Sequence, residues 1–281
     1  MARKAASSVN GPPSPPAHGE SKPVTVPDFM AAKARGVRLT MLTAYDCGMA
    51  RLLDAAGVDA LLVGDSLGMV VQGFEHCLSV TLDEVIYHTK MVVRGASRSL
   101  VVADMPFMSY QVSPQQALTS AGRLIKEGGA HAVKLEGGER SAAAVAAICQ
   151  ADIPVMGHVG LTPQSIRRLG GFRVQRHEEQ VIHDAVAIEQ AGAFAIVVEC
   201  VPTALAEKVT KAVKVPTIGI GAGAGCDGQI LVIHDMLGLS DLHPRFVKQY
   251  ADLGKAMMDA VRSYCREVKD GSFPGPEHGF H

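Results

Sequence analysis

Hydrophobic and polar positions alternate along the chain in one repeated pattern: a short apolar run, a polar or glycine break, then a longer segment with helical periodicity. The apolar runs predict strands at Leu39–Ala44, Ala60–Val63, Leu100–Asp104, Ala132–Leu135, Val155–Val159, Ala195–Glu199, Thr217–Ile220 and Leu231–His234. The periodic segments predict helices at Cys47–Ala56, Leu82–Ala96, Gln115–Glu127, Ser141–Ala151, Glu179–Ala191, Ala204–Val213 and about Phe246–Lys269. Strands that alternate with helices of this length are typical of a parallel sheet.

The number of strands predicts how the sheet closes. Eight strand–helix units favour an α/β protein with a closed (β/α)8 barrel, the TIM-barrel fold, which usually forms one domain of about 250 residues. Too few residues separate Ile220 from Leu231 for a crossover helix, so a loop or a single helical turn is expected there. Residues 1–22 are rich in Pro, Ser and Ala and predict a disordered tail, with the barrel domain spanning 23–281.

Composition narrows the range of partners. The 281 residues carry a formal charge of -1 at pH 7, which gives no electrostatic reason to expect nucleic acid or an anionic membrane as a partner. No apolar stretch approaches the roughly 20 residues that span a bilayer. The six cysteines form no C-x-x-C pair, which favours free thiols and a cytoplasmic location. A small-molecule ligand is therefore expected.

Ionisable residues recur where the predicted strands end, and in this fold the active site lies at those ends. They include Asp65 with Ser66, Asp104, Lys134 with Glu136, His158 and Glu199. Lys134 and Glu136 lie two positions apart and should face the same side, toward the barrel mouth. Two acidic groups on neighbouring strands, Asp65 and Asp104, would repel each other unless a cation lies between them or one of them is protonated. For a cation, oxygen ligands with water suit Mg²⁺ better than zinc.

Other motifs support different chemistries. Gly64-Asp65-Ser66-Leu67-Gly68 fits the G-x-S-x-G pattern of a hydrolase, with Ser66 as nucleophile, but residues 69–80 show no helical period after it. The glycines of 219–225 could cradle a phosphate, although a close-packed turn is favoured because the P-loop Lys is missing. His177 and His183 lie six apart, which does not match a helical metal site.

Several motifs occur together in an order that resembles the ketopantoate hydroxymethyltransferase family. They are Thr43-Ala44-Tyr45-Asp46, Val63-Gly64-Asp65-Ser66-Leu67-Gly68-Met69, Tyr87-His88-Thr89, Ala103-Asp104-Met105-Pro106-Phe107-Met108, Val133-Lys134-Leu135-Glu136-Gly137-Gly138, Gly157-His158-Val159-Gly160-Leu161-Thr162-Pro163-Gln164, Glu199-Cys200-Val201-Pro202 and Ile218-Gly219-Ile220-Gly221-Ala222-Gly223. The similarity extends from about Val26 to the C-terminus.

The resemblance implies an enzyme of pantothenate biosynthesis that uses Mg²⁺. It would transfer a hydroxymethyl group from 5,10-methylenetetrahydrofolate to 3-methyl-2-oxobutanoate, through an enolate stabilised by the metal, to form 2-dehydropantoate. Carried over by position, Asp65 and Asp104 would bind the metal and Glu136 its water shell, Ser66 and Lys134 would hold the keto acid, His158 would line the site, and Glu199 would be the base. It also implies a homo-oligomer, with a decamer as the expected size.

Two alternatives remain open beside this interpretation. One is a Mg²⁺-dependent lyase or mutase of the phosphoenolpyruvate/pyruvate type, which would also enolise a 2-oxo acid on such a barrel. The other is a non-catalytic barrel that binds a keto acid or a folate, which acidic residues at the strand ends do not favour.

Overall fold

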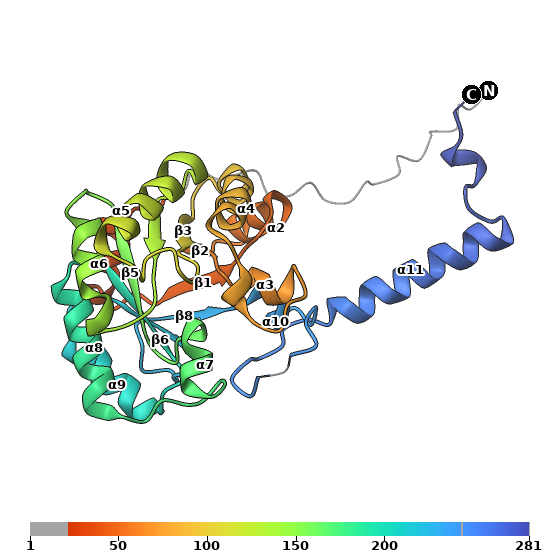
Figure 1. Ribbon diagram of the computed structural model, residues 1–281. Coiled ribbons are helices and arrows are strands. Elements are labelled where there is room, and N and C mark those ends of the chain that lie inside the picture. Colours follow the sequence, from red (N-terminus) through yellow and green to blue (C-terminus); the bar gives the residue numbers. More distant parts are fainter. Residues whose placement is uncertain (1–21, 243, 281) are drawn as a thin grey trace, which may run out of the picture.

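A computed structural model describes residues 22–242 and 244–280 and contains a closed, parallel eight-stranded barrel (Figure 1). Each strand pairs with its neighbours in sequence, and β1 closes the barrel by pairing with β8. The predicted single-domain (β/α)8 barrel is confirmed. Residues 1–21 of the predicted tail lie outside the described residues. The strands are β1 (Leu39–Thr43), β2 (Ala60–Val63), β3 (Leu100–Asp104), β4 (Ala132–Lys134), β5 (Val155–Gly160), β6 (Ala195–Glu199), β7 (Thr217–Ile220) and β8 (Gly228–Leu231).

Helices surround the barrel, and each predicted crossover helix is present (Figure 1). The helices are α1 (Val26–Ala34), α2 (Cys47–Ala55), α3 (Leu67–Val70), α4 (Leu82–Gly95), α5 (Pro114–Arg123), α6 (Glu139–Cys149), α7 (Ile166–Leu169), α8 (Glu178–Gln190), α9 (Thr203–Ala212), α10 (Ile233–Met236) and α11 (Leu253–Asp270). Shorter turns are η1 (Cys77–Ser79), η2 (Leu124–Gly128), η3 (Pro163–Ser165) and η4 (Pro276–His278). As predicted, the connection from β7 to β8 contains no helix.

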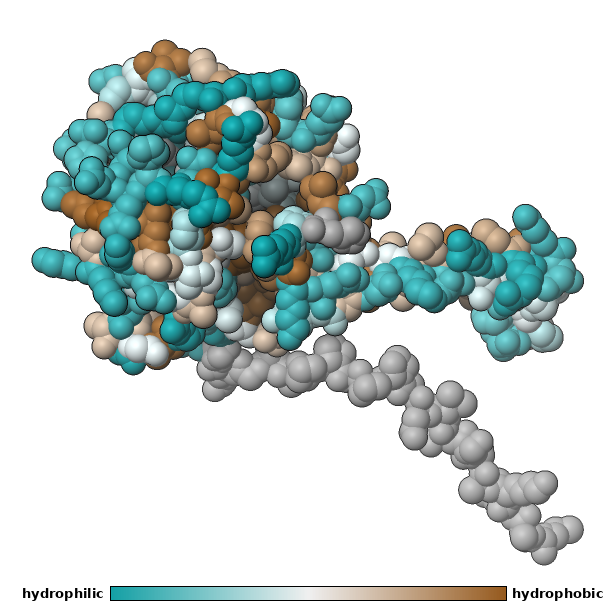
Figure 2. Space-filling model, turned by 90° about the horizontal axis from the view of Figure 1, so that it is seen from below, coloured by the Kyte–Doolittle hydropathy of each residue, from teal (hydrophilic) through white to brown (hydrophobic). Residues whose placement is uncertain are grey.

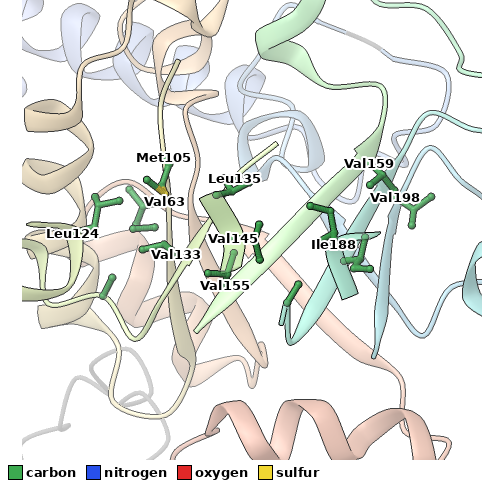
Figure 3. Packing of buried hydrophobic residues seen from close by; sticks show 14 of the residues in the cluster. Val63, Met105, Leu124, Val133, Leu135, Val145, Val155, Val159, Ile188 and Val198 are labelled. Atoms are coloured by element: carbon green, nitrogen blue, oxygen red, sulfur yellow. The ribbon is translucent and has the colours of Figure 1, made fainter. Parts of the chain in front are cut away.

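Alternating side chains divide each strand between two cores. On β2, Leu61 and Val63 belong to the large core between sheet and helices, whereas Ala60 and Leu62 belong to the core inside the barrel. Figure 3 shows part of the outer core, where side chains of the strands meet those of the surrounding helices. Positions that continue the inner set past the strand ends therefore point into the barrel mouth.

Helix α1 closes the N-terminal end of the barrel. Phe29 is fully buried and packs edge-to-face on Phe194, with the ring centroids 5.8 Å apart. A capping box begins the helix, because the Thr25 hydroxyl accepts from the backbone N–H of Asp28 and the Asp28 carboxylate accepts from Thr25. With this end closed by α1, a ligand would enter the barrel from the opposite, C-terminal end.

The C-terminal part of the chain differs from the prediction. Strand β8 begins at Gly228, three residues before the predicted start at Leu231, and Ile233 begins the short helix α10 instead of continuing the strand. Gly228 fits the barrel closure because a Cβ there would lie 2.6 Å from the carbonyl oxygen of Leu39. The final helix begins at Leu253, not near Phe246.

Helix α11 extends away from the barrel and has no buried residue (Figure 1). Figure 2 shows hydrophobic as well as hydrophilic residues along this projecting arm. Within the described ranges, no helix combines the length and apolar character needed to cross a membrane.

Candidate active site

A cavity of about 590 Å³ opens at the C-terminal ends of the strands. Its lining includes all seven residues singled out from the sequence: Asp65, Ser66, Asp104, Lys134, Glu136, His158 and Glu199. Five of them, from Asp104 to Glu199, occupy inward-facing positions on or just after β3, β4, β5 and β6. Residues distant in sequence thus meet in one place because the barrel brings its strand ends together.

Buried charges lie in the floor of this cavity. The Lys134 Nζ donates to both carboxylate oxygens of Asp104, at 2.7 and 2.9 Å, and the backbone N–H of Asp65 donates to Asp104 Oδ2 at 3.3 Å. Burial, and after it repulsion by Asp104 and Glu136, raises the pKa of Asp65 to about 8. Burial also raises the pKa of Asp104, although the Lys134 ammonium opposes that effect. The site therefore holds more negative charge than its one lysine compensates.

Glu136 and Asp65 share one amide partner, Gln164 in η3. The Gln164 Nε2 donates to Asp65 Oδ2 at 2.8 Å, and its backbone N–H donates to Glu136 Oε2 at 3.0 Å. Tyr110 donates its hydroxyl to Gln164 Oε1 at 2.8 Å, which fixes the amide orientation. The motif Gly157–Gln164 contains this residue but predicts no role for it, because Gln164 follows β5 in a turn and not at the strand end.

His158 lies between two glutamates. Its Nδ1 is 3.5 Å from Glu136 Oε1, and its Nε2 is 3.1 Å from Glu199 Oε2. Both ring nitrogens thus lie within ion-pair distance of a carboxylate. Burial and Lys134 lower the pKa of His158, but Glu136 and Glu199 outweigh them and raise it to about 9. The position between two glutamates thus favours the protonated form of the His158 ring.

Ser66 lies beside Tyr45, and their hydroxyl oxygens are 2.8 Å apart. Helix α3 begins directly after Ser66, so the expectation of a loop without helix there is wrong. The serine nevertheless has ordinary helical backbone angles, φ -54° and ψ -15°, and not the strained turn of a nucleophile elbow. Its hydroxyl is hydrogen-bonded to a tyrosine, which leaves the hydrolase interpretation without an activating base.

The donor set fits a hard divalent cation such as Mg²⁺. Asp65 and Asp104 supply carboxylate oxygens, and Glu136 Oε1 is buried without a hydrogen-bond partner. In the described part of the chain, no three His, Cys, Asp or Glu side chains already converge as a metal cluster. Two carboxylate ligands with water in the remaining positions agree with both observations.

Other sequence candidates have structural roles. Asp46 caps α2 by accepting from the backbone N–H of Met49 at 2.8 Å. His183 pairs with Glu139 at the surface. In the 219–225 loop, a Cβ on Gly223 would lie 2.5 Å from the Thr203 hydroxyl, so the loop is a close-packed turn as favoured from the sequence.

Comparisons with known proteins agree on one family. The family model for ketopantoate hydroxymethyltransferase matches residues 23–276. A 3-methyl-2-oxobutanoate hydroxymethyltransferase from Clostridium novyi (strain NT) is 59% identical over 261 residues, covering 91% of this chain and 95% of that protein.

Solved structures with a similar fold are more distant in sequence. One is 2,3-dimethylmalate lyase in its trigonal crystal form, with a TM-score of 0.60 at 17% identity, covering 92% of this chain and 89% of that one. Another is phosphonopyruvate hydrolase in complex with oxalate and Mg²⁺, with a TM-score of 0.59 at 16% identity, covering 90% and 93%. At such identities the likeness shows the shared barrel fold.

Proposed function

The chain belongs to the ketopantoate hydroxymethyltransferase family, enzymes that transfer a one-carbon group to 3-methyl-2-oxobutanoate, and we propose how its cavity carries out this transfer. The proposal rests on one observation: acidic and basic side chains from β2 to β6 converge in a single cavity beside an excess of negative charge. The product is 2-dehydropantoate, and the one-carbon donor is 5,10-methylenetetrahydrofolate.

Asp65 and Asp104 would hold Mg²⁺, with Glu136 oriented toward its water shell. When bound, the metal would withdraw electron density from the keto acid and make the proton on its branched carbon more acidic. Lys134, held by Asp104, adds a second positive charge, and Ser66 donates a hydrogen bond to the substrate. These contacts orient the keto acid in the floor of the cavity.

Glu199 is the base that removes the proton from the branched carbon. Its carboxylate enters the cavity at an inward position of β6 and is 3.1 Å from the protonated His158, which holds it in place. The carbon nucleophile formed in this step then attacks the methylene carbon of the folate and forms the new C–C bond. Both C–N bonds of the methylene bridge are broken, one water molecule supplies the hydroxyl group of the product, and the two folate nitrogens take up the proton removed by Glu199 and one proton of that water, which releases tetrahydrofolate. His158 lines the site and compensates the charge of Glu136 and Glu199.

The proposed assembly is a homo-oligomer in which α11 packs against another copy of the chain. The apolar residues of α11 recur on one face and are exposed; they are Leu253, Met257, Met258, Val261, Tyr264 and Val268. A surface groove of about 960 Å³ lies beside β8, where the described residues supply no covering helix. A decamer remains the expected size.

Six free cysteines favour a reducing compartment, for which we propose the cytoplasm.

A product assay tests the proposed reaction. The protein is mixed with Mg²⁺, 3-methyl-2-oxobutanoate and methylenetetrahydrofolate, and 2-dehydropantoate is measured by mass spectrometry. We expect product only when all components are present. If the folded protein binds the keto acid but forms no product, the proposed reaction is wrong and a keto-acid-binding barrel is favoured. If it cleaves or rearranges a 2-oxo acid without folate, the lyase or mutase alternative is favoured.

A further inference from the structure

The outer part of the cavity differs chemically from its floor. Phe172, Val174, Leu242 and Phe246 line it, yet they are 57%, 48%, 47% and 40% exposed. A cavity of several hundred Å³ is large enough for a drug-sized ligand, and the small keto acid would fill only the charged floor. The exposed apolar rim therefore suits the flat ring system of a second, larger ligand.

Arginines are concentrated in the segment that forms this rim. Arg167, Arg168, Arg173 and Arg176 lie within ten residues, although basic and acidic residues of the whole chain nearly balance at 27 and 28. Arg173 lines the cavity itself. Arg167 Nη2 is 3.1 Å from His76 Nε2, so it reaches across to the loop that follows α3. Arg173 thus adds a positive charge at the entrance, separate from Lys134 in the floor.

These four arginines have no acidic partner, in contrast to Arg98 and Arg123. Arg98 pairs with Asp59 at 3.0 Å, and Arg123 pairs with Asp83 at 2.8 Å. Between residues 22 and 280, apart from position 243, none of the four at the entrance forms an ion pair with a carboxylate. Guanidinium groups bind carboxylates in a bidentate manner, so this entrance suits a ligand that carries several carboxylates.

We propose that the arginine segment 167–176 binds the glutamate tail of the folate donor, while Phe172 packs against its ring system. The inference rests on the proposed function and extends it to a preference: a donor with several γ-linked glutamates binds more tightly than one with a single glutamate. The ring system of the folate would pack on the apolar rim above the charged floor, and its chain of glutamate carboxylates would extend outward to the arginines.

Kinetics and binding with two forms of the donor test this preference. The triple variant Arg167→Ala/Arg168→Ala/Arg173→Ala is compared with the wild type, using monoglutamyl and pentaglutamyl methylenetetrahydrofolate. Because each exposed ion pair contributes little, we expect about a tenfold rise in KM for the pentaglutamyl donor and a much smaller rise for the monoglutamyl donor. The preference of the wild type should also shrink in high salt. In calorimetry with monoglutamyl and pentaglutamyl tetrahydrofolate, the ratio of the two Kd values should change in the triple variant as the ratio of the KM values does.

A control variant and two further readouts separate the possible outcomes. Arg94→Ala removes an exposed arginine at the end of α4 that leads into β3, opposite the cavity, and should leave both KM values unchanged. The inference would be overturned if KM rose by the same factor for both donors, so that their ratio stayed unchanged, or if the triple variant had a different molecular mass from the wild type. The proposed function would still stand in those cases, because product would form from the monoglutamyl donor. Absence of product with either donor would instead contradict the proposed function.

Discussion

Gln164 shows how a neutral side chain can keep carboxylates together in a buried site. Its side-chain Nε2 donates to Asp65, its backbone N–H donates to Glu136, and Tyr110 donates to its side-chain oxygen. The amide cannot neutralise charge, so burial and, after it, repulsion by Asp104 and Glu136 raise the pKa of Asp65. Such an arrangement is stable enough to fold and still favours the arrival of a cation.

Single substitutions distinguish the proposed metal ligand Asp104 from the proposed substrate-binding residue Ser66. Asp104→Asn removes one carboxylate of the acidic pair, and we expect it to weaken Mg²⁺ binding and keto-acid binding together by at least about tenfold, as measured by calorimetry. Ser66→Ala removes a hydroxyl but no charge. It should weaken keto-acid binding by about 1 kcal/mol and leave Mg²⁺ affinity unchanged. Wild-type Mg²⁺ affinity in Asp104→Asn would remove that residue from the metal site.

Among the elements, α2 is joined to the start of β3 through one buried carboxylate. Asp54 accepts from the backbone N–H groups of Ser97, Arg98 and Ser99 and from both serine hydroxyls, at 2.7 to 3.0 Å. Burial alone would raise the pKa of Asp54, but these hydrogen bonds outweigh it and hold the pKa below its usual range. The ionised form of Asp54 therefore stabilises the folded state.

Asp54→Asn tests this connection. We expect the free energy of unfolding in urea to fall by about 2–4 kcal/mol at pH 7, because an amide cannot accept from all five donors. The folded-state pKa lies below the unfolded value of about 3.9, so the contribution is complete above that pH and is lost as pH falls further. The difference between wild type and variant should shrink accordingly below about pH 4. The exposed Asp83→Asn should change stability by less than about 1 kcal/mol. An equal loss in both variants would contradict the assignment.

Prediction from the sequence succeeded where local pattern and barrel geometry agree. Inward positions such as Lys134 and Glu136 follow from the two-residue period of a strand, and the barrel brings them together. The pattern failed at β8, because the apolar run at Leu231 spans the end of a strand and the start of α10. Gln164 was not assigned a role, because contacts made from a turn depend on how distant segments pack.

For the whole molecule, the barrel and α11 present different surfaces. The barrel buries most of its apolar residues in two cores, whereas α11 projects from the barrel and leaves an apolar face exposed (Figure 1). An isolated helix of this kind gains little stability from propensity alone, so packing is expected to hold it. A second copy of the chain would supply that packing.

Assembly can be tested on the exposed face of α11. Val261→Glu places a charge in the apolar face, and we expect light scattering to show a lower molecular mass than that of the wild type at equal concentration. Arg266→Glu changes a charge on the opposite face of the same helix and should leave the mass unchanged. A monomeric wild type, or equal masses for wild type and Val261→Glu, would contradict the proposed role of α11.

The central claim is that this cavity removes a proton from the branched carbon of 3-methyl-2-oxobutanoate with Glu199 as base. Deuterium exchange at that carbon, followed by NMR in heavy water with Mg²⁺ and without folate, measures this step alone. We predict exchange catalysed by the wild type and its loss in Glu199→Gln, while the variant still binds keto acid and Mg²⁺ in calorimetry. Exchange at the wild-type rate in Glu199→Gln would contradict the account.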